Sequence, residues 1–379
     1  MPTKHAFLSA SGSYRWLNCT RQPTFAQELG TVRGETVYAR EGTVAHAVAE
    51  RWLSFIRLGY EISEIEIENR IRDEFKDNGF FNDDMFINIR GYIGFLLPHI
   101  RDSASVWDFE TEVSLDDYVP QGFGTVDFSS YDRVSHTLRI VDLKYGQGVR
   151  VDAVSNSQLQ LYALGMIKVI KRDVQDAVID RVETVIYQPR INNISSDVYT
   201  IAELESFGKV VAEKAYKAFT GNGATLNAGD WCRFCGCKSR CRAYGEMMLV
   251  KGQNEFKSLD KLSDDELEDF LNRATELSTY VSTLKDELVE AIKSGYNSHG
   301  YTLKEVSGKK SMSDNAAKML DNLGIDPYER KLKSITQLKK EVGKDLFEKA
   351  VEGLLTVGAT SYRLEKVKDI FKEVKVDES

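Results

Sequence analysis

Two acidic residues and a lysine occur on neighbouring segments that are expected to be extended. Asp127 lies in FGTVDFSSY (123–131), and Asp142 and Lys144 lie in TLRIVDLKYG (137–146). Side chains two residues apart on a strand project from the same face, so Asp142 and Lys144 should point together, and Asp127 can meet them from the next strand. Carboxylates bind Mg²⁺ or Mn²⁺, and such a cation can activate water for phosphodiester hydrolysis. The pattern therefore predicts a metal-dependent hydrolytic site.

The tripeptide Asp142-Leu143-Lys144 also has a simpler interpretation, because acidic-apolar-lysine sequences are common on solvated strand faces. Against that interpretation, Asp142 follows the apolar pair Ile140-Val141, where a charge without a partner would be costly. In a metal site the backbone carbonyl of Leu143 could complete the coordination. Lys144 could orient the nucleophile or stabilise developing charge.

The sequence Gly-Thr-Val-Asp (124–127), followed by Val-Asp-Leu-Lys-Tyr-Gly (141–146), resembles the paired motifs of RecB-family nucleases of the PD-(D/E)XK class. The resemblance implies that Asp127 and Asp142 bind the metal and that Lys144 is catalytic. It also implies a restriction-endonuclease-like α/β core, in which helices flank a mixed central sheet.

Two further motifs of that family occur in the expected order. Gly-Thr-Val-Ala-His (42–46) resembles the upstream helical motif, which implies that His46 is a metal ligand. Gln158 and Tyr162 resemble the downstream Gln-x-x-x-Tyr helix that borders the active site. Each motif has an alternative, because a lone helical histidine is commonly a packed or surface residue, and Gln158 and Tyr162 could belong to an ordinary core-facing stripe.

Four of the five cysteines fall between residues 232 and 241, and the fifth is Cys19, which favours a metal site over a disulfide framework. The spacing Cys232-x2-Cys235-x5-Cys241 resembles that of iron-sulfur nucleases of the AddB and CRISPR-adaptation type. The resemblance implies a [4Fe-4S] cluster held by these three residues and Cys19. Three alternatives stay open: Cys237 in place of Cys235 or Cys19, a zinc site, and reduced structural thiols.

Hydrophobic periodicity predicts the elements that must position these residues. Helices are expected at 41–57, 84–101, 156–170 and near 201–220, and strands at 107–115, 123–131, 137–146 and 182–189. The three earlier strands should form a meander. We assign residues 1–250 to the nuclease domain.

A smaller accessory domain, of α+β or helical type, is predicted for residues 251–379. It should begin with a long amphipathic helix that is capped by Ser263 and Glu266 and ends at Gly295. Its later lysines are interspersed with acids, so a solvated surface is favoured over phosphate contacts; they include Lys309, Lys310, Lys331, Lys333, Lys339 and Lys340.

The chain has a formal net charge of −8 and a pI near 5.4, so no global basic field indicates a nucleic-acid partner. A local basic track would suffice for a nuclease whose acidic site is neutralised by metal. No signal peptide and no apolar run of roughly 20 residues is present, which predicts a cytoplasmic location without membrane contact.

The family resemblance implies a metal-dependent deoxyribonuclease, an exonuclease acting on single- or double-stranded DNA ends in phage recombination or replication. The whole chain also resembles a RecB-like family that is common in prophages. A recombination partner such as a single-strand annealing protein would fit this function, and ring-forming relatives leave a homo-oligomer open. The alternatives are an inactive DNA-binding scaffold that keeps the nuclease fold, and a zinc-stabilised interaction module.

Overall fold

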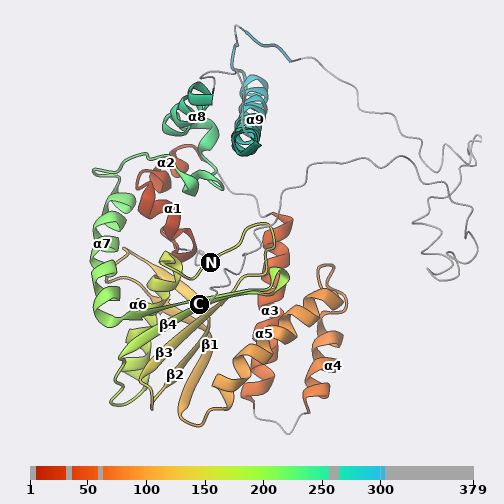
Figure 1. The fold of residues 1–379 in the computed structure, drawn as a ribbon, viewed down its shortest axis with the longest axis vertical. Coiled ribbons are helices and arrows are strands. Elements are labelled where there is room, and N and C mark those ends of the chain that lie inside the picture. Colours follow the sequence, from red (N-terminus) through yellow and green to blue (C-terminus); the bar gives the residue numbers. More distant parts are fainter. Residues whose placement is uncertain (1–5, 31–35, 59–62, 256–263, 299, 304–379) are drawn as a thin grey trace, which may run out of the picture. The chain divides into compact units, whose positions relative to one another are not determined.

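The computed structural model describes residues 6–30, 36–58, 63–255, 264–298 and 300–303 (Figure 1). The chain divides into two compact units, Met1–Thr302 and Leu303–Ser379, and every element named below belongs to the first. The domain boundary predicted near residue 250 falls within helix α8 (Arg242–Glu255). The lysines predicted to lie on a solvated surface, from Lys309 to Lys340, are outside the described residues.

A five-stranded mixed sheet forms the centre of the first unit, with strand order β1-β2-β3-β4-β5. The strands are β1 (Ser105–Ser114), β2 (Phe123–Asp132), β3 (Thr137–Leu143), β4 (Arg181–Gln188) and β5 (Asn193–Thr200). The predicted meander of β1, β2 and β3 is confirmed, and β4 runs parallel to β3. The sequence analysis did not predict β5, an antiparallel edge strand whose alternate side chains are polar or exposed.

The helices also follow the periodicity. They are α1 (Ser13–Asn18), α2 (Gln22–Glu28), α3 (Val37–Arg57), α4 (Glu64–Phe75), α5 (Asp83–Arg101), α6 (Ser157–Asp173), α7 (Ile201–Thr220), α8 and α9 (Asp264–Lys293). Helix α3 begins before the predicted residue 41 because the Thr36 hydroxyl caps it by accepting from the Ala39 amide. Within the described ranges, no helix combines the length and apolar character needed to span a bilayer.

Two hydrophobic cores cover the two faces of the sheet. Leu138 and Ile140 of β3 pack in one core with residues of α6 and α7, whereas Val141 and Leu143 pack in the other with residues of α3 and α5. Figure 1 shows these two pairs of helices on opposite sides of the strands. The sheet is therefore a buried middle layer, as expected for an α/β fold.

The alternation of β1 and β2 between the two faces breaks at one rung of the sheet. Phe109 packs in the α3–α5 core but Val113 in the α6–α7 core, although residues four apart should share a face. On β2, Val126 and Phe128 are likewise on opposite faces. The pairing register is the same on both sides of the break, and Glu110, at the break, has a left-handed backbone with φ 47°. Both strands therefore change face together at this rung.

Close packing of α6 on β1 leads to a stability prediction. A Cβ at Gly165 of α6 would lie 2.7 Å from Val113 Cβ, whereas one at Gly94 of α5 would meet nothing within 4 Å. We expect Gly165→Ala to be destabilising, because over-packing costs about 1–3 kcal/mol and outweighs the helix propensity of about 1 kcal/mol that alanine adds. Gly94→Ala is the matched control and should be stabilising. Urea unfolding checks both variants, and equal free energies of unfolding would contradict the packing argument.

Candidate functional site

The site begins where β2 and β3 separate. Their pairing ends at Phe128 and Val141, while β3 stays paired with β4, where the Lys144 amide donates to the Tyr187 carbonyl. Beyond this last pair, Asp127 Oδ2 accepts a hydrogen bond of 2.7 Å from the Leu143 amide. A side-chain carboxylate thus replaces the interstrand ladder, and the two aspartates lie where the strands part.

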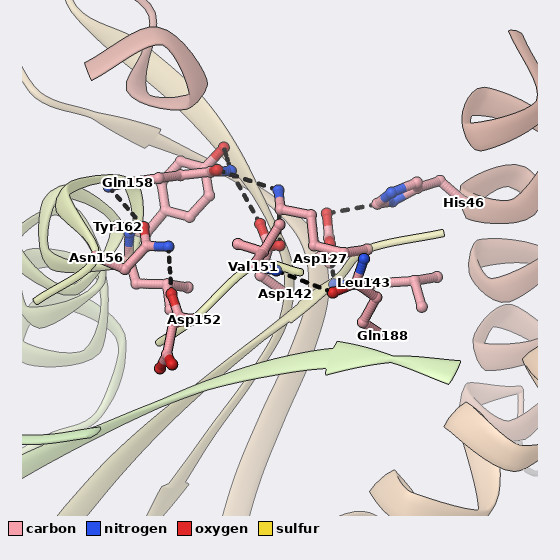
Figure 2. A network of polar contacts seen from close by, with 12 residues as sticks. His46, Asp127, Asp142, Leu143, Val151, Asp152, Asn156, Gln158, Tyr162 and Gln188 are labelled. Carbon is pink, nitrogen blue, oxygen red and sulfur yellow. Dashed lines mark hydrogen bonds and ion pairs between the residues drawn. The ribbon is translucent and has the colours of Figure 1, made fainter. Parts of the chain in front are cut away.

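Asp142, Lys144, Gln158 and Tyr162 form one polar network on the α6 side of the sheet (Figure 2). Lys144 Nζ lies 2.8 Å from Asp142 Oδ2, so the two side chains share a face as the strand period predicts. The Gln158 amide bridges them: its Oε1 accepts from Lys144 Nζ at 3.1 Å and its Nε2 donates to Asp142 Oδ1 at 2.9 Å. Nε2 also lies 3.2 Å from Tyr162 Oη. The motif residues of α6 and β3 therefore form one bonded unit.

Burial and charge pairing set the protonation of this unit. Burial raises the pKa of Asp142, which is 2% exposed, although the Lys144 ammonium partly offsets the effect. Burial disfavours the charge on Lys144, but Asp142 and Asp127 outweigh it and raise the pKa of the ammonium above its ordinary value. Lys144 is therefore held as a cation beside two carboxyl groups.

His46 reaches the same site from α3, on the other side of the sheet. Its Nδ1 lies 3.4 Å from Asp127 Oδ1, and its side chain keeps 35% of its area exposed at the edge of the site. Burial of the ring disfavours the imidazolium, but the Asp127 carboxylate outweighs it and raises the pKa of His46 to about 9. Burial likewise disfavours the Asp127 carboxylate, but His46 stabilises it and the pKa of Asp127 is lowered. The two groups form an ion pair.

Glu110 is a site residue that the sequence analysis missed. Potential ligand atoms of Glu110, His46 and Asp127 all lie within 4.8 Å of one another. Burial, and then the Asp127 carboxylate, raise the pKa of Glu110 to about 7. The segment 107–115 predicts an ordinary strand, in which Glu110 would be one more alternating acid. In the structure Glu110 lies between the pairs Phe109–Phe128 and Thr111–Val126, where the β1–β2 pairing is interrupted.

Gly124, the glycine of the β2 motif, has a packing role. A Cβ at this position would lie 2.7 Å from the ring atom Cε1 of Tyr162. Only glycine therefore lets the Tyr162 ring pack against β2, where its hydroxyl meets Gln158. The motifs of β2 and α6 are linked through this contact.

The loop between Lys144 and α6 is held by two buried amides from the β4–β5 turn. Gln188 Nε2 donates to the carbonyls of Gly146 (2.6 Å) and Val149 (2.9 Å), and its Oε1 accepts from the Val151 amide (3.1 Å). Asn193 Nδ2 donates to the Val151 carbonyl at 2.8 Å. These bonds fix the path of the chain from β3 to the start of α6, and so the position of Gln158. The predicted motifs did not include Gln188 or Asn193.

The five cysteines line one cavity, together with Arg15 and Lys238. Burial raises the pKa of Cys19 and of Cys232. The nearby thiols of Cys235 and Cys241 raise both pKa values further, and the Cys19 thiol also raises that of Cys232. The segment around Cys19 is tied to the end of the domain by backbone contacts: Arg21 donates to the Thr225 carbonyl at 3.0 Å, and the Thr225 amide donates to Thr20 Oγ1 at 2.9 Å. The fold thus brings Cys19 to the cysteines more than two hundred residues later.

Helices α8 and α9 pack on this cysteine region. Tyr244 and Met248 of α8 form a small core with Cys232, and Leu277 and Tyr280 of α9 pack against it. Arg240 Nε also lies 2.6 Å from Glu287 Oε1 of α9. The amphipathic helix predicted after residue 263 therefore packs on the cysteine region through part of its apolar face.

The His46–Asp127 pair predicts an unusual titration in chelator-treated protein. NMR should show the His46 ring titrating near pH 9 instead of near its ordinary value of 6.5. Because the folded-state pKa is raised, the stability contributed by this group is fully present below about pH 6.5 and is lost as pH rises through about 9. In Asp127→Asn the ring should titrate near or below 6.5, since burial then dominates. A midpoint that does not move in that variant would refute the pair.

His99 is an internal control for this titration. Burial, and then the Arg139 guanidinium, hold the pKa of His99 below its ordinary value. That pKa should be the same in the wild type and in Asp127→Asn.

Comparison with known proteins gives a family and a distant structural likeness. A solved structure described as "Crystal structure of SSO0001" is 13% identical, with 59% of this chain and 95% of that chain covered and a TM-score of 0.25. The family described as "Protein of unknown function (DUF2800)" matches residues 5–369 of the 379-residue sequence. The chain therefore belongs to the DUF2800 family.

Proposed function

We propose that this protein is a divalent-cation-dependent DNA nuclease of the PD-(D/E)XK class, related to the RecB nuclease domain, and that it acts as an exonuclease on DNA ends. One observation carries the proposal. Side chains from α3, β2 and the end of β3 converge where β2 and β3 separate: His46, Asp127, Asp142 and Lys144. Gln158 and Tyr162 border the same point from α6.

The donor set at this point suits a hard divalent cation. Carboxylate oxygens from Asp127 and Asp142 and an imidazole nitrogen from His46 are ligands that Mg²⁺ and Mn²⁺ accept, and the backbone of Leu143 lies beside Asp127. The cation, when bound, would act as a Lewis acid on the phosphodiester and lower the pKa of water. It would also offset the charge of carboxylates that burial otherwise makes costly.

Lys144 is the residue we assign to the reacting phosphate. It is held as a cation by Asp142 and fixed in direction by the Gln158 carbonyl oxygen, so its ammonium is positioned before a substrate binds. A preorganised cation stabilises negative charge that develops on phosphate oxygens. Gln158 is a positioning residue in this scheme, and Tyr162 orients Gln158.

We also propose that Cys19, Cys232, Cys235 and Cys241 hold a [4Fe-4S] cluster. Thiolate ligands from four residues suit such a cluster, and the thiols of Cys235 and Cys241 lie close enough to Cys19 and Cys232 to raise the pKa values of those two. Lys238 at the same cavity would offset part of the cluster's negative charge. The role of the cluster is structural, since it would cross-link the beginning of the domain to its end.

The nuclease proposal predicts metal-dependent loss of end-labelled linear DNA but not of closed circular DNA, with Mg²⁺ or Mn²⁺ and not with chelator. Asp142→Ala and Lys144→Ala should each lower the rate at least about 100-fold, as removal of a preorganised charge-stabilising group does. Lys171→Ala, on the exposed end of α6, is the matched control and should cleave normally.

Cleavage by Lys144→Ala at the wild-type rate would refute the site assignment. Degradation of circular DNA would replace the exonuclease with an endonuclease. Folded, iron-loaded protein that binds DNA without cutting it would instead indicate the inactive scaffold.

The cluster proposal predicts that Cys241→Ala loses iron and visible colour. Its free energy of unfolding should fall by roughly 4 kcal/mol, the order expected when a cross-link that closes so long a loop is removed. Cys237→Ala is the matched control in the same segment, and it should keep iron and stability. Iron and sulfide analysis of anaerobically purified protein, with thermal melting, checks both variants.

Three results would contradict the ligand set. Full iron content in Cys241→Ala excludes Cys241. Loss of iron in Cys237→Ala would assign Cys237 as a ligand. Zinc without iron in the wild type would indicate the zinc-stabilised module.

A further inference from the structure

We infer that Glu110 is a ligand of the divalent cation at His46 and Asp127. This inference rests on the metal site of the proposed function and extends it by a residue outside the sequence motifs. It adds a carboxylate ligand from β1 to the nitrogen ligand from α3 and the carboxylate ligands from β2 and β3.

The three side chains lie close enough together to share one cation. The donor atoms of His46, Glu110 and Asp127 all lie within 4.8 Å of one another, so a single cation can contact all three after small adjustments. Asp127 can serve this cation through Oδ1, because its Oδ2 already accepts from the Leu143 amide.

A buried hydroxyl without a hydrogen-bond partner, that of Tyr92, lies near these residues in the described part of the chain. Tyr92 of α5 is 1% exposed, and within the described part of the chain its Oη has no hydrogen-bond partner. Burial, and then the nearby carboxylates of Asp127, Asp142 and Glu110, raise the pKa of this hydroxyl. A buried hydroxyl without a partner is costly, so Tyr92 indicates a polar ligand in the space between these carboxylates.

The backbone at Glu110 is consistent with this role. A φ of 47° is unfavourable for a residue with a Cβ, and here it occurs in the middle of a strand. It coincides with the rung where β1 and β2 change face, between the pairs Phe109–Phe128 and Thr111–Val126. The strained conformation directs Glu110 toward His46 and Asp127 instead of along the regular strand alternation.

The chemistry of the three donors selects among cations. Imidazole is a borderline ligand that suits transition metals, whereas Mg²⁺ and Ca²⁺ prefer oxygen alone. One imidazole with two carboxylates should therefore favour Mn²⁺ over Mg²⁺ at this position. Mn²⁺ is therefore the tighter-binding ion at this site.

The test is Mn²⁺ binding to the full-length protein without DNA, measured by the loss of the free-ion electron paramagnetic resonance signal. Glu110→Gln keeps the side-chain shape but removes the charge. It should weaken Mn²⁺ binding at least about tenfold, because mutation of a residue that only hydrogen-bonds to a metal ligand already lowers metal affinity by that much. Glu112→Gln, at an exposed position of the same strand, is the matched control with unchanged affinity. In a competition experiment, the wild type should bind Mg²⁺ more weakly than Mn²⁺.

A second variant separates ligation from folding. Glu110→Gly should melt at a higher temperature than the wild type in chelator, because glycine tolerates the left-handed backbone, and should still bind Mn²⁺ weakly. Wild-type affinity in a folded Glu110→Gln, or no Mn²⁺ binding by the wild type, would overturn the inference. If Glu110→Gln loses Mn²⁺ binding and the wild type cuts no DNA, Glu110 is supported as a metal ligand while the proposed nuclease activity is rejected.

Discussion

The hydrogen bond from the Leu143 amide to the Asp127 carboxylate is the contact on which the site depends. It satisfies a backbone donor at the point where β2 leaves β3, so the two strands can part without a buried unpaired amide. The same bond holds Asp127 beside β3 with its other oxygen turned toward His46. Because β3 remains paired with β4, Asp142 and Lys144 are presented from a fixed strand.

Two helical layers contribute opposite parts of the site. The α6 layer supplies Gln158, which links Asp142 to Lys144, and the α3 layer supplies His46, which pairs with Asp127. Each buried acid thus has a basic partner, which offsets the cost of placing charge in the interior. Glu110 is the exception: burial and its acidic neighbours raise its pKa, and a cation would relieve that repulsion.

The second structural centre is the cysteine cavity, which joins the beginning of the domain to its end. Backbone contacts between Arg21 and Thr225 already bring Cys19 beside the later cysteines, so the fold and any cluster would reinforce each other. Helices α8 and α9 pack on this region, through Tyr244 and Leu277 among others. The candidate metal site and the cysteine cavity are thus built from different elements of the same unit.

Local periodicity alone was enough to predict the meander of β1, β2 and β3, helix α6 and the common face of Asp142 and Lys144, because a strand repeats every two residues and a helix every 3.6. The resemblance of the motifs added His46, Gln158 and Tyr162, which the structure brings to the same point. Glu110, the contact between Gly124 and Tyr162, and the buried Gln188 depended on the tertiary structure. Their positions result from strand register, from a local break in alternation and from packing between distant segments, and no short sequence pattern encodes these because each is a property of two chain segments at once.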